Sequence, residues 1–482
     1  MVKRFVPLGT HQRRSMRHAL PALAALVLGL ALVVLGAYSA VLPAAGQETF
    51  PEPDEIVSEN GVLQAKLTAE EKQIEISGTP VTGRVYNGSF VGPTLRLDPG
   101  DTLDLELDNQ LSEPTNLHYH GTHVSPSGDS DNVLRHIMAG ETGQYQLDFP
   151  PNHAPGTYWY HSHQHGISEE QVFGGMSGLI VVEGLQDLLP ADLRDIEERS
   201  FALKDFQLTS DGQIVQDNID SNAPTTRTVN GAVNPSLSIA PGETQLWRLA
   251  NIGADIWYQV ALEGHAFYVI GEDSNPVWQT WSAQSLVLPP GKRFDVLVQG
   301  GSPGTYIFRT LDFDQGGDHY PDTTLATLTV EGTAVTPAAM PTSLYAQDDP
   351  VHGDLSSATV DKERTLVFSE DDATNAFMID GKQFDPNRVD QQVKLGTVEE
   401  WTIRNDTEEL HPFHIHINDY QVMSINGAPY AANSLQDTIP LPIHGEVVIR
   451  IPFRDYTGKF VYHCHILNHE DNGMMGLIEV VP

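Results

Sequence analysis

Four His-x-His pairs are the most conspicuous chemical feature of the sequence. Two pairs lie within residues 118–163 and two within residues 414–465. In a β-strand, residues i and i+2 point to the same face, so each pair directs two imidazoles to one side. Neutral imidazole is the commonest metal ligand among side chains. We therefore expect eight imidazoles to converge on one metal centre, namely those of His118, His120, His161, His163, His414, His416, His463 and His465.

A second ligand set lies around Cys464, the only cysteine of the chain. This residue stands between the two histidines of a pair, so on a strand it faces away from them. His411 has the same opposite parity, and His469 follows in a turn that can fold back. A thiolate with two imidazoles is the ligand set of blue-copper electron-transfer sites. The pattern predicts a copper site that Cys464 joins covalently to the histidine cluster.

Zinc is the alternative metal for an isolated His-x-His pair. A structural zinc takes about four ligands, so it leaves most of these histidines unexplained. Blue-copper sites also use a weak thioether ligand. Met474, ten residues after Cys464, is a candidate for that ligand. Copper therefore accounts for more of the pattern than zinc does.

Strands must position these ligands, and the sequence contains a threefold repeat of strand-rich segments. Pro93–Thr102 is similar to Pro235–Thr244. Related turns at Gly156, Gly304 and Gly458 recur about 150 residues apart, which indicates tandem domains. With 41 glycines and 32 prolines the chain is rich in turns. We expect an all-β protein made of three tandem Greek-key β-sandwiches.

The repeat predicts where the domains begin and end. Residues 46–190 and 359–482 form the first and third domains, which carry all the ligands. Residues 191–335 form the second domain, which has Phe308-Arg309-Thr310 where the others have paired histidines. Residues 336–358 form a linker. The metal centre should therefore lie between the first and third domains, with the second as a spacer.

Residues 1–45 are expected to be a signal peptide or an N-terminal anchor. A basic head precedes a long uncharged apolar run, which is typical of an export signal. Arg13-Arg14 partly matches the twin-arginine export motif, and a retained membrane anchor is the alternative. In both cases we expect the globular part to be exported, with membrane contact only if the segment is retained. The basic head consists of Lys3, Arg4, Arg13, Arg14 and Arg17.

Composition excludes several classes of partner and fold. The 482-residue chain has 64 acidic against 27 basic residues, a net charge of −37, which disfavours nucleic acid as a partner. One cysteine excludes an intrachain disulfide framework. A hydrophobic content of 40% disfavours disorder. No motif in the sequence explains the acidic charge, and none indicates the oligomeric state.

The chain resembles the three-domain multicopper oxidases, close to bacterial laccases and the bilirubin-oxidase group. The motifs that carry the resemblance are Asn116–Gly121, Tyr160–His163, His411–His416 and His463–Met474. Together they are very specific, and the similarity extends over about residues 60–482. The resemblance implies cupredoxin-like domains and four copper ions per chain: one type 1, one type 2 and a type 3 pair.

The resemblance also implies which residues serve which copper. The type 1 copper would take His411, Cys464 and His469, with Met474 at the family's axial spacing and Met475 as its rival. The type 2 copper would take His118 and His414, and the type 3 pair would take His120, His161, His163, His416, His463 and His465.

Two carboxylates match acidic positions that assist oxygen reduction in related bacterial enzymes. Glu470 follows His469, and Asp129 follows the first His-x-His pair, with Asp131 as its competitor. Reduction of dioxygen consumes protons, and a carboxylate near the metal suits general-acid catalysis. The expected catalytic residues are therefore Glu470 and Asp129 as proton donors, with His469 and Cys464 on the electron path.

The implied activity is one-electron oxidation of phenols or aromatic amines, coupled to reduction of dioxygen to water. The partners would be small-molecule electron donors and dioxygen. A metallo-oxidase acting on Fe(II) or Cu(I) is the alternative: the acidic segment Asp312–Asp318 with Asp322 could serve it, but a methionine-rich insert is missing. A non-catalytic relative or an electron carrier would leave most of the histidines without a use, so an enzyme is favoured.

Overall fold

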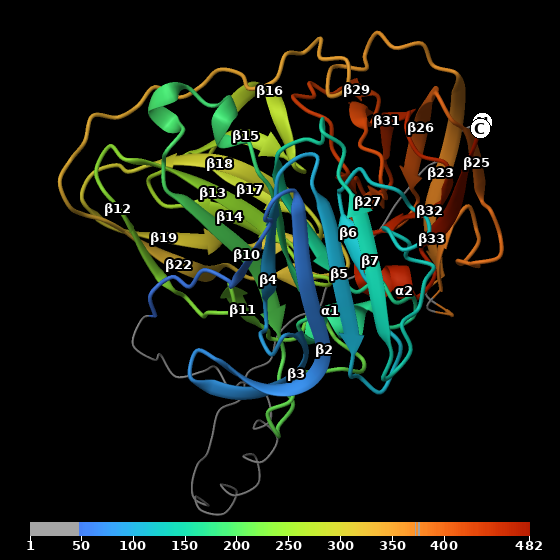
Figure 1. Cartoon of the computed structure of the whole chain (residues 1–482), viewed down its shortest axis with the longest axis horizontal. Coiled ribbons are helices and arrows are strands. Elements are labelled where there is room, and N and C mark those ends of the chain that lie inside the picture. Colours follow the sequence, from blue (N-terminus) through green and yellow to red (C-terminus); the bar gives the residue numbers. More distant parts are fainter. Residues whose placement is uncertain (1–47, 372, 375) are drawn as a thin grey trace, which may run out of the picture. The chain divides into compact units, whose positions relative to one another are not determined.

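The computed structural model describes residues 48–371, 373–374 and 376–482, and these form an almost entirely β protein. The expected signal peptide or anchor lies outside the described residues. Within the described ranges no helix has the length and apolar character needed to cross a membrane. The prediction of an all-β chain built from sandwiches is confirmed (Figure 1).

The first sandwich consists of two sheets that share one hydrophobic core. In β5, the leucines at 103, 105 and 107 are buried while the acidic residues between them are more exposed, as the alternating sequence predicts. One sheet has the order β1 (Glu55–Val57), β4 (Gly92–Leu97), β9 (Ser177–Val182), β8 (Gly156–His161), β6 (His118–His120); the other has the order β3 (Thr79–Tyr86), β2 (Val62–Ile76), β5 (Thr102–Asn109), β7 (Thr142–Asp148).

The second sandwich has a larger aromatic core around Trp247, Trp257 and Phe308. Its strand β13 is buried along its whole length, because one face packs in this core and the other lies against the first sandwich. One sheet has the order β11 (Thr226–Val229), β10 (Glu198–Phe206), β13 (Thr244–Asn251), β18 (Arg293–Gln299), β15 (Phe267–Glu272), β16 (Asn275–Ala283); the other has the order β12 (Ser236–Ile239), β22 (Thr323–Val330), β19 (Gly304–Thr310), β14 (Tyr258–Leu262), β17 (Ser285–Leu288).

The third sandwich buries Trp401, Phe413 and Tyr462 in its core, together with Cys464 and Met474. Two of the predicted ligands are thus part of the packing that stabilises this sandwich. One sheet has the order β24 (Ala376–Ile379), β23 (Lys362–Asp371), β26 (Thr397–Asn405), β31 (Glu446–Phe453), β28 (Gln421–Ile425), β29 (Ala428–Pro429); the other has the order β25 (Gln391–Lys394), β33 (Met475–Val481), β32 (Gly458–Cys464), β27 (His411–Ile415), β30 (Thr438–Leu441).

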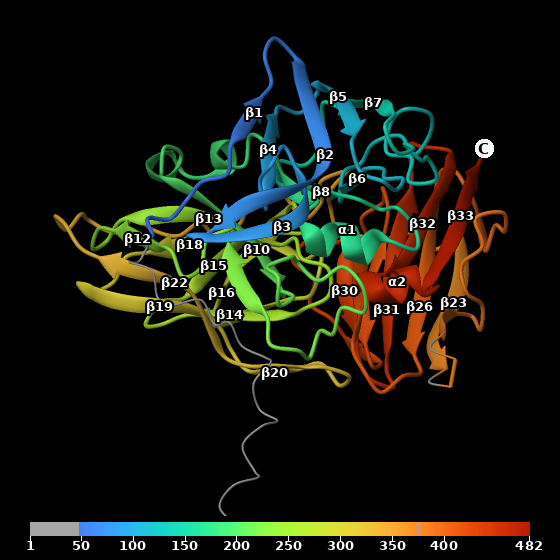
Figure 2. The ribbon, with the colours of Figure 1, turned by 90° about the horizontal axis from the view of Figure 1, so that it is seen from below.

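The remaining elements are short connections. Strands β20 (Phe313–Asp314) and β21 (His319–Tyr320) form a small ribbon, and η1 (Gln186–Leu188) and η2 (Ala191–Leu193) are single turns after the first sandwich. Helices α1 (Ser168–Gly174) and α2 (Leu467–Asp471) lie side by side in Figure 2.

Each sandwich contacts the other two. In Figure 2 the strands of the first, in blue and cyan, lie at the top, with those of the second, in green and yellow, at the lower left and those of the third, in orange and red, at the right. The two short helices join the first sandwich to the third: the backbone N–H of Glu169 donates to Asp471 Oδ2 at 2.9 Å. Lys292 of the second sandwich donates to the carbonyl oxygen of Thr438 in the third at 3.0 Å. The paired histidines lie where these sandwiches meet.

Candidate metal centre

The structure brings all eight paired imidazoles together between the first and third sandwiches. Strands β6 and β8 place His118 opposite His161, and strands β27 and β32 place His414 opposite His463. Every one of the eight side chains is buried. Three triads have ligand nitrogens within 4.8 Å of one another: His118, His120 and His414; His120, His161 and His465; His163, His416 and His463. We name these residues the eight-histidine cluster.

The composition of the triads matches the grouping that the resemblance implies. The first triad contains both histidines that the resemblance implies for type 2 copper, and the other two triads contain the six implied for the type 3 pair. The two sandwiches thus contribute to every triad, so neither could complete the cluster alone.

Most of the rings are fixed by one nitrogen, which leaves the other free. The Nδ1 atoms of His161 and His463 lie 2.8 Å from the carbonyl oxygens of Ser162 and Cys464. His118 Nδ1 lies 3.0 Å from Asp131 Oδ1. Hydrogen bonds of this kind set the tautomer of a metal-binding histidine.

Several ring nitrogens of the cluster have no partner although they are buried, and the Nε2 atoms of His118, His161 and His414 are among them. A buried polar atom without a hydrogen bond costs about 1–3 kcal/mol. Elsewhere in the cluster, nitrogens face each other directly, as in the 3.2 Å contact between the Nε2 atoms of His416 and His463. Cations bound between these lone pairs would satisfy them, so the residues fit a metal cluster.

His120 is oriented the opposite way. Its Nε2 lies 3.1 Å from Asp437 Oδ1, and its Nδ1 faces His465 Nε2 at 3.1 Å. Asp437 also touches a second ring, since its carbonyl oxygen lies 2.9 Å from His414 Nδ1. One aspartate therefore fixes two rings of the cluster.

Burial favours the neutral form of His118, His161 and His463. It lowers the pKa of His161 to about 3 and lowers the pKa of His118 and His463 well below the ordinary value. The neighbouring imidazoles lower the pKa of His118 and His463 further. Since the metal-binding form of imidazole is the neutral one, these residues are ready to bind a cation.

The Cys464 site lies on the other side of the same strand. Cys464 Sγ is 3.5 Å from His411 Nδ1 and 3.7 Å from His469 Nδ1, and the two Nδ1 atoms are 3.2 Å apart. His469 belongs to helix α2 rather than to the expected turn. Burial raises the pKa of the Cys464 thiol, so a thiolate here needs a cation beside it. This three-residue set fits a thiolate-bound metal.

Met474 is placed better than Met475 for the axial position. Its carbonyl oxygen accepts from the N–H of Cys464 at 3.0 Å, and its N–H donates to the carbonyl oxygen of His469 at 2.8 Å. Met474 packs in the same hydrophobic core as Cys464, whereas Met475 packs with Val461 in a separate cluster. The geometry therefore favours Met474.

Glu470 lies beside the eight-histidine cluster. Its carboxylate oxygens are 3.3 Å from His163 Nδ1 and 3.5 Å from His463 Nδ1, and Ser168 donates its hydroxyl to Glu470 at 3.2 Å. Burial raises the pKa of Glu470 well above its ordinary value. The carboxyl group can therefore hold a proton next to two cluster histidines.

The structure places Asp131, and not the expected Asp129, beside the eight-histidine cluster. The Asp129 side chain is 70% exposed and pairs with Arg135, whereas the Asp131 carboxylate is fully buried and contacts His118. The N–H of Tyr119 also donates to Asp131, at 3.1 Å. Sequence spacing cannot separate two aspartates in one loop, because the loop path decides which one turns inward.

Three further residues at these sites carried no recognised motif. Asp437 and Arg293 pair with each other behind His120, and Glu409 Oε1 lies 3.3 Å from His469 Nε2. Asp437 had a usable signal, since it is the one charged residue between Leu435 and Leu441. A lone charge in an otherwise uncharged stretch indicates a buried partner.

The side chains beside His469 are not the acidic residues of Asp312–Asp318 or Asp322 that a metallo-oxidase was expected to use. Phe377 stacks on His469 with ring centroids 4.0 Å apart. In the segment that was expected to supply carboxylates, Asp312 pairs with His319, and Gln315 donates to Glu409 at 2.9 Å. The carboxylate beside His469 is therefore Glu409.

Comparison with known proteins identifies the family. Three family profiles, each described as multicopper oxidase, match residues 68–187, 180–333 and 354–482. The chain is 28% identical to multicopper oxidase mco from Staphylococcus aureus, over 90% of this chain and 92% of that protein. It is 26% identical to a laccase from Haloferax volcanii, over 81% and 76% of the two chains. It is also 27% identical to cell division protein FtsP from Photorhabdus laumondii, over 95% and 97%.

Solved structures agree with the sequence relatives. A multicopper oxidase from Campylobacter jejuni, described as a metallo-oxidase, has a TM-score of 0.79 at 27% identity, over 90% of this chain and 95% of that one. A laccase-like multi-copper oxidase, CueO from Ochrobactrum sp., has a TM-score of 0.78 at 26% identity, over 90% and 100%. The profiles cover the first and third sandwiches, which carry the candidate ligands, and the second sandwich. The chain belongs to the multicopper oxidase family and is an oxidoreductase.

Proposed function

We propose that the chain is a laccase-like enzyme that oxidises phenols or aromatic amines one electron at a time and reduces dioxygen to water. The observation that carries the proposal is the strand end His463–His465. Cys464 belongs to the three-residue site, and its two neighbours belong to the eight-histidine cluster. Electrons accepted at the first site therefore have a covalent route to the second.

Copper bound at both sites would supply the redox chemistry: one ion at the Cys464 site would accept single electrons, and three at the cluster would store electrons for dioxygen. We infer about four copper ions per chain from the two ligand sets. The Cys464 site would use His411, Cys464, His469 and Met474, and the cluster would use its eight histidines.

Donor access is supported by the position of His469. Its side chain is 10% exposed, whereas those of the eight cluster histidines are nearly or fully enclosed. Phe377 covers one face of the ring, so a flat aromatic donor has an apolar surface to approach. An electron donor need only reach the ring edge, which is consistent with broad specificity.

Two carboxyl groups are placed to serve the protons that dioxygen reduction consumes. Glu470 holds a proton beside His163 and His463, on the side where helices α1 and α2 meet. Asp131 takes the place of Asp129 as the second carboxyl group at the cluster. It also fixes the tautomer of His118. General-acid catalysis by such a group contributes about 10²–10⁴-fold.

A metallo-oxidase is the second candidate, and Glu409 favours it. This carboxylate lies next to His469 Nε2 and could bind a donor cation at the ring edge. Glu409→Gln tests this: the KM for Fe(II) or Cu(I) should rise while that for a neutral phenol stays unchanged if the donors are metal ions. An equal effect on both donors would argue against a cation site.

A steady-state panel tests the proposed activity. Phenols, aromatic amines, bilirubin, Fe(II) and Cu(I) are supplied in turn, with oxygen consumption as the readout. Higher turnover on the organic donors supports the laccase-like proposal, and higher turnover on the metal ions supports the second candidate. Copper-loaded protein that consumes no oxygen with any donor would favour a non-catalytic role, which the FtsP relative makes worth testing.

We also propose export of the globular part, supported by the sequence of residues 1–45.

A further inference from the structure

The second sandwich contributes a wall of the eight-histidine cluster although it supplies none of the predicted ligands. The loop between β17 and β18 carries Gly291 and Lys292, and Arg293 is the first residue of β18. A Cβ atom at Gly291 would lie 2.9 Å from His120 Cε1 and 3.2 Å from His465 Cδ2, and its φ is +86°. The loop backbone therefore packs directly on two rings of the cluster.

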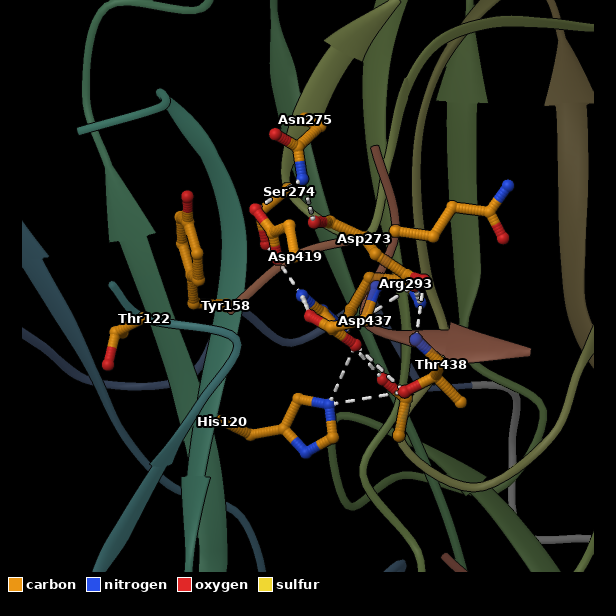
Figure 3. A network of polar contacts seen from close by, with 12 residues as sticks. His120, Thr122, Tyr158, Asp273, Ser274, Asn275, Arg293, Asp419, Asp437 and Thr438 are labelled. Atoms are coloured by element: carbon orange, nitrogen blue, oxygen red, sulfur yellow. Dashed lines mark hydrogen bonds and ion pairs between the residues drawn. The ribbon is translucent and has the colours of Figure 1, made fainter. Parts of the chain in front are cut away.

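Arg293 is fully buried, and all five N–H groups of its guanidinium donate hydrogen bonds. Its Nη1 and Nη2 donate to the two carboxylate oxygens of Asp437 at 2.8 and 2.7 Å, a bidentate ion pair. The remaining donors go to the carbonyl oxygens of Thr157 and Gly291 and to Ser274 Oγ, at 3.1, 2.9 and 2.8 Å. A guanidinium held at five points has one position, and it imposes that position on Asp437 (Figure 3).

Asp437 passes this constraint to the cluster. Figure 3 shows its carboxylate between Arg293 and His120, and its Oδ1 lies 3.1 Å from His120 Nε2. Because a carboxylate accepts hydrogen bonds, Nε2 carries the proton and Nδ1 keeps its lone pair toward His465. The inverted orientation of His120 thus depends on a carboxylate that is held from the second sandwich.

A second ion pair, between Lys292 and Asp273, fixes the backbone of Asp437. Lys292 Nζ lies 2.9 Å from Asp273 Oδ2. That carboxylate accepts the backbone N–H groups of Asp437 and Thr438 at 3.2 and 3.1 Å. The main chain and the side chain of Asp437 are therefore both fixed by residues of the second sandwich.

We propose that Arg293 is a positioning residue for the copper cluster: through Asp437 it sets the ring orientation with which His120 offers Nδ1 to the metal. The second sandwich is then part of the oxygen-reducing centre and more than a spacer. The proposal rests on the proposed function, because it requires copper at the eight-histidine cluster. Loss of the bidentate contact with Arg293 would leave the Asp437 carboxylate as a buried charge without its cation. The carboxylate could then move, and the His120 ring would lose its fixed orientation.

Arg293→Gln tests the proposal, with Arg248→Gln as the matched control. Arg248 is also a buried arginine of the second sandwich, but it pairs with Asp295 and Glu198. Copper content, the blue band of the Cys464 site, the near-ultraviolet band of the type 3 pair and the type 2 electron paramagnetic resonance signal are measured on each protein. The melting temperature of the copper-free protein reports whether the fold is retained.

We expect Arg293→Gln to keep the blue band and to lose copper, the near-ultraviolet band and about 10- to 100-fold of turnover. Arg248→Gln should keep all of these signals. A cluster signature in Arg293→Gln that equals that of the wild type, or an equal loss in Arg248→Gln, would overturn the proposal.

Arg293→Lys keeps the test decisive if the glutamine variant does not fold. Lysine retains the charge but cannot form the two-point contact with Asp437, so we expect an intermediate loss of the cluster signals. Unchanged cluster signals in this variant would overturn the proposal. A wild-type protein without copper in the cluster would instead reject the proposed function, and the two failures are thereby distinguished.

Discussion

The two candidate metal sites differ in how far they are closed. The eight-histidine cluster is enclosed by all three sandwiches, and a carboxylate or a backbone carbonyl oxygen fixes most of its rings. The Cys464 site is smaller, and one of its rings, that of His469, is partly exposed beside Phe377. Under the proposed function, the enclosed site would bind dioxygen and the partly exposed Cys464 site would accept electrons from larger donors.

The closure of the two sites also rests on different parts of the chain. The Cys464 site draws its ligands from the third sandwich alone, from strands and a helix within residues 411–474. The eight-histidine cluster needs the first and third sandwiches for its ligands and the second for Arg293 behind Asp437. Disturbing the contacts between sandwiches should therefore damage the cluster before it damages the Cys464 site.

The largest effect is expected from Cys464→Ser, which removes the residue that links the two sites. The blue band and turnover should both disappear, because a serine hydroxyl is a poor copper ligand and the covalent route loses its thiolate. The cluster histidines remain, so bound copper should fall by about one ion per chain. Visible absorption and elemental analysis check this. A variant that stays blue would refute the assignment of Cys464.

Glu470→Gln should separate the two sites kinetically. Reoxidation of the reduced enzyme by dioxygen should slow by about 100-fold, because glutamine cannot donate the proton that Glu470 holds. Reduction of the Cys464 site by a donor should stay fast, since Glu470 contacts cluster histidines. Stopped-flow measurement of each half-reaction checks this. Unchanged reoxidation would remove Glu470 as the proton donor.

Asp131→Asn and Asp129→Asn form a matched pair in one loop. The first replaces the buried acceptor of His118 Nδ1 and should lower turnover or copper retention about 10- to 100-fold. The second removes an exposed ion pair with Arg135 and should change both by less than about twofold. Dialysis against a chelator, followed by copper analysis, measures retention. The reverse order of effects would restore the sequence-based preference for Asp129.

The smallest effect is expected at the axial position of the Cys464 site. Met474→Leu should raise its reduction potential by about 60 mV, equivalent to about a tenfold shift in a one-electron equilibrium. Met475→Leu should leave the potential unchanged, because Met475 packs with Val461 away from Cys464. Redox titration of the blue band compares the two. A larger shift in the second variant would reverse the assignment.

The sequence was enough to predict the all-β fold and the separation of the ligands into two sets. Strand parity is a local property, so His463, Cys464 and His465 could be assigned to opposite faces without a structure. The partners of those ligands are not local. Asp437 lies 317 residues from His120 along the chain, and only the packing of three sandwiches brings them together.

Loops were the other limit. Asp129 and Asp131 are two residues apart, and the path of an irregular segment determines which one is buried. The helical turn at His469 was likewise too short to carry a periodic pattern. Side-chain placement in such segments follows from tertiary contacts rather than from residue type.

The number of electrons consumed per dioxygen tests the central claim most directly. It shows whether the eight-histidine cluster reduces dioxygen fully to water with the electrons that enter at the Cys464 site. A one-electron donor is oxidised in a closed oxygen-electrode cell, and donor consumed, oxygen consumed and hydrogen peroxide formed are measured together. The account predicts about four donor equivalents for each dioxygen and no peroxide, since dioxygen is reduced to water. A ratio near two with accumulating peroxide would contradict it.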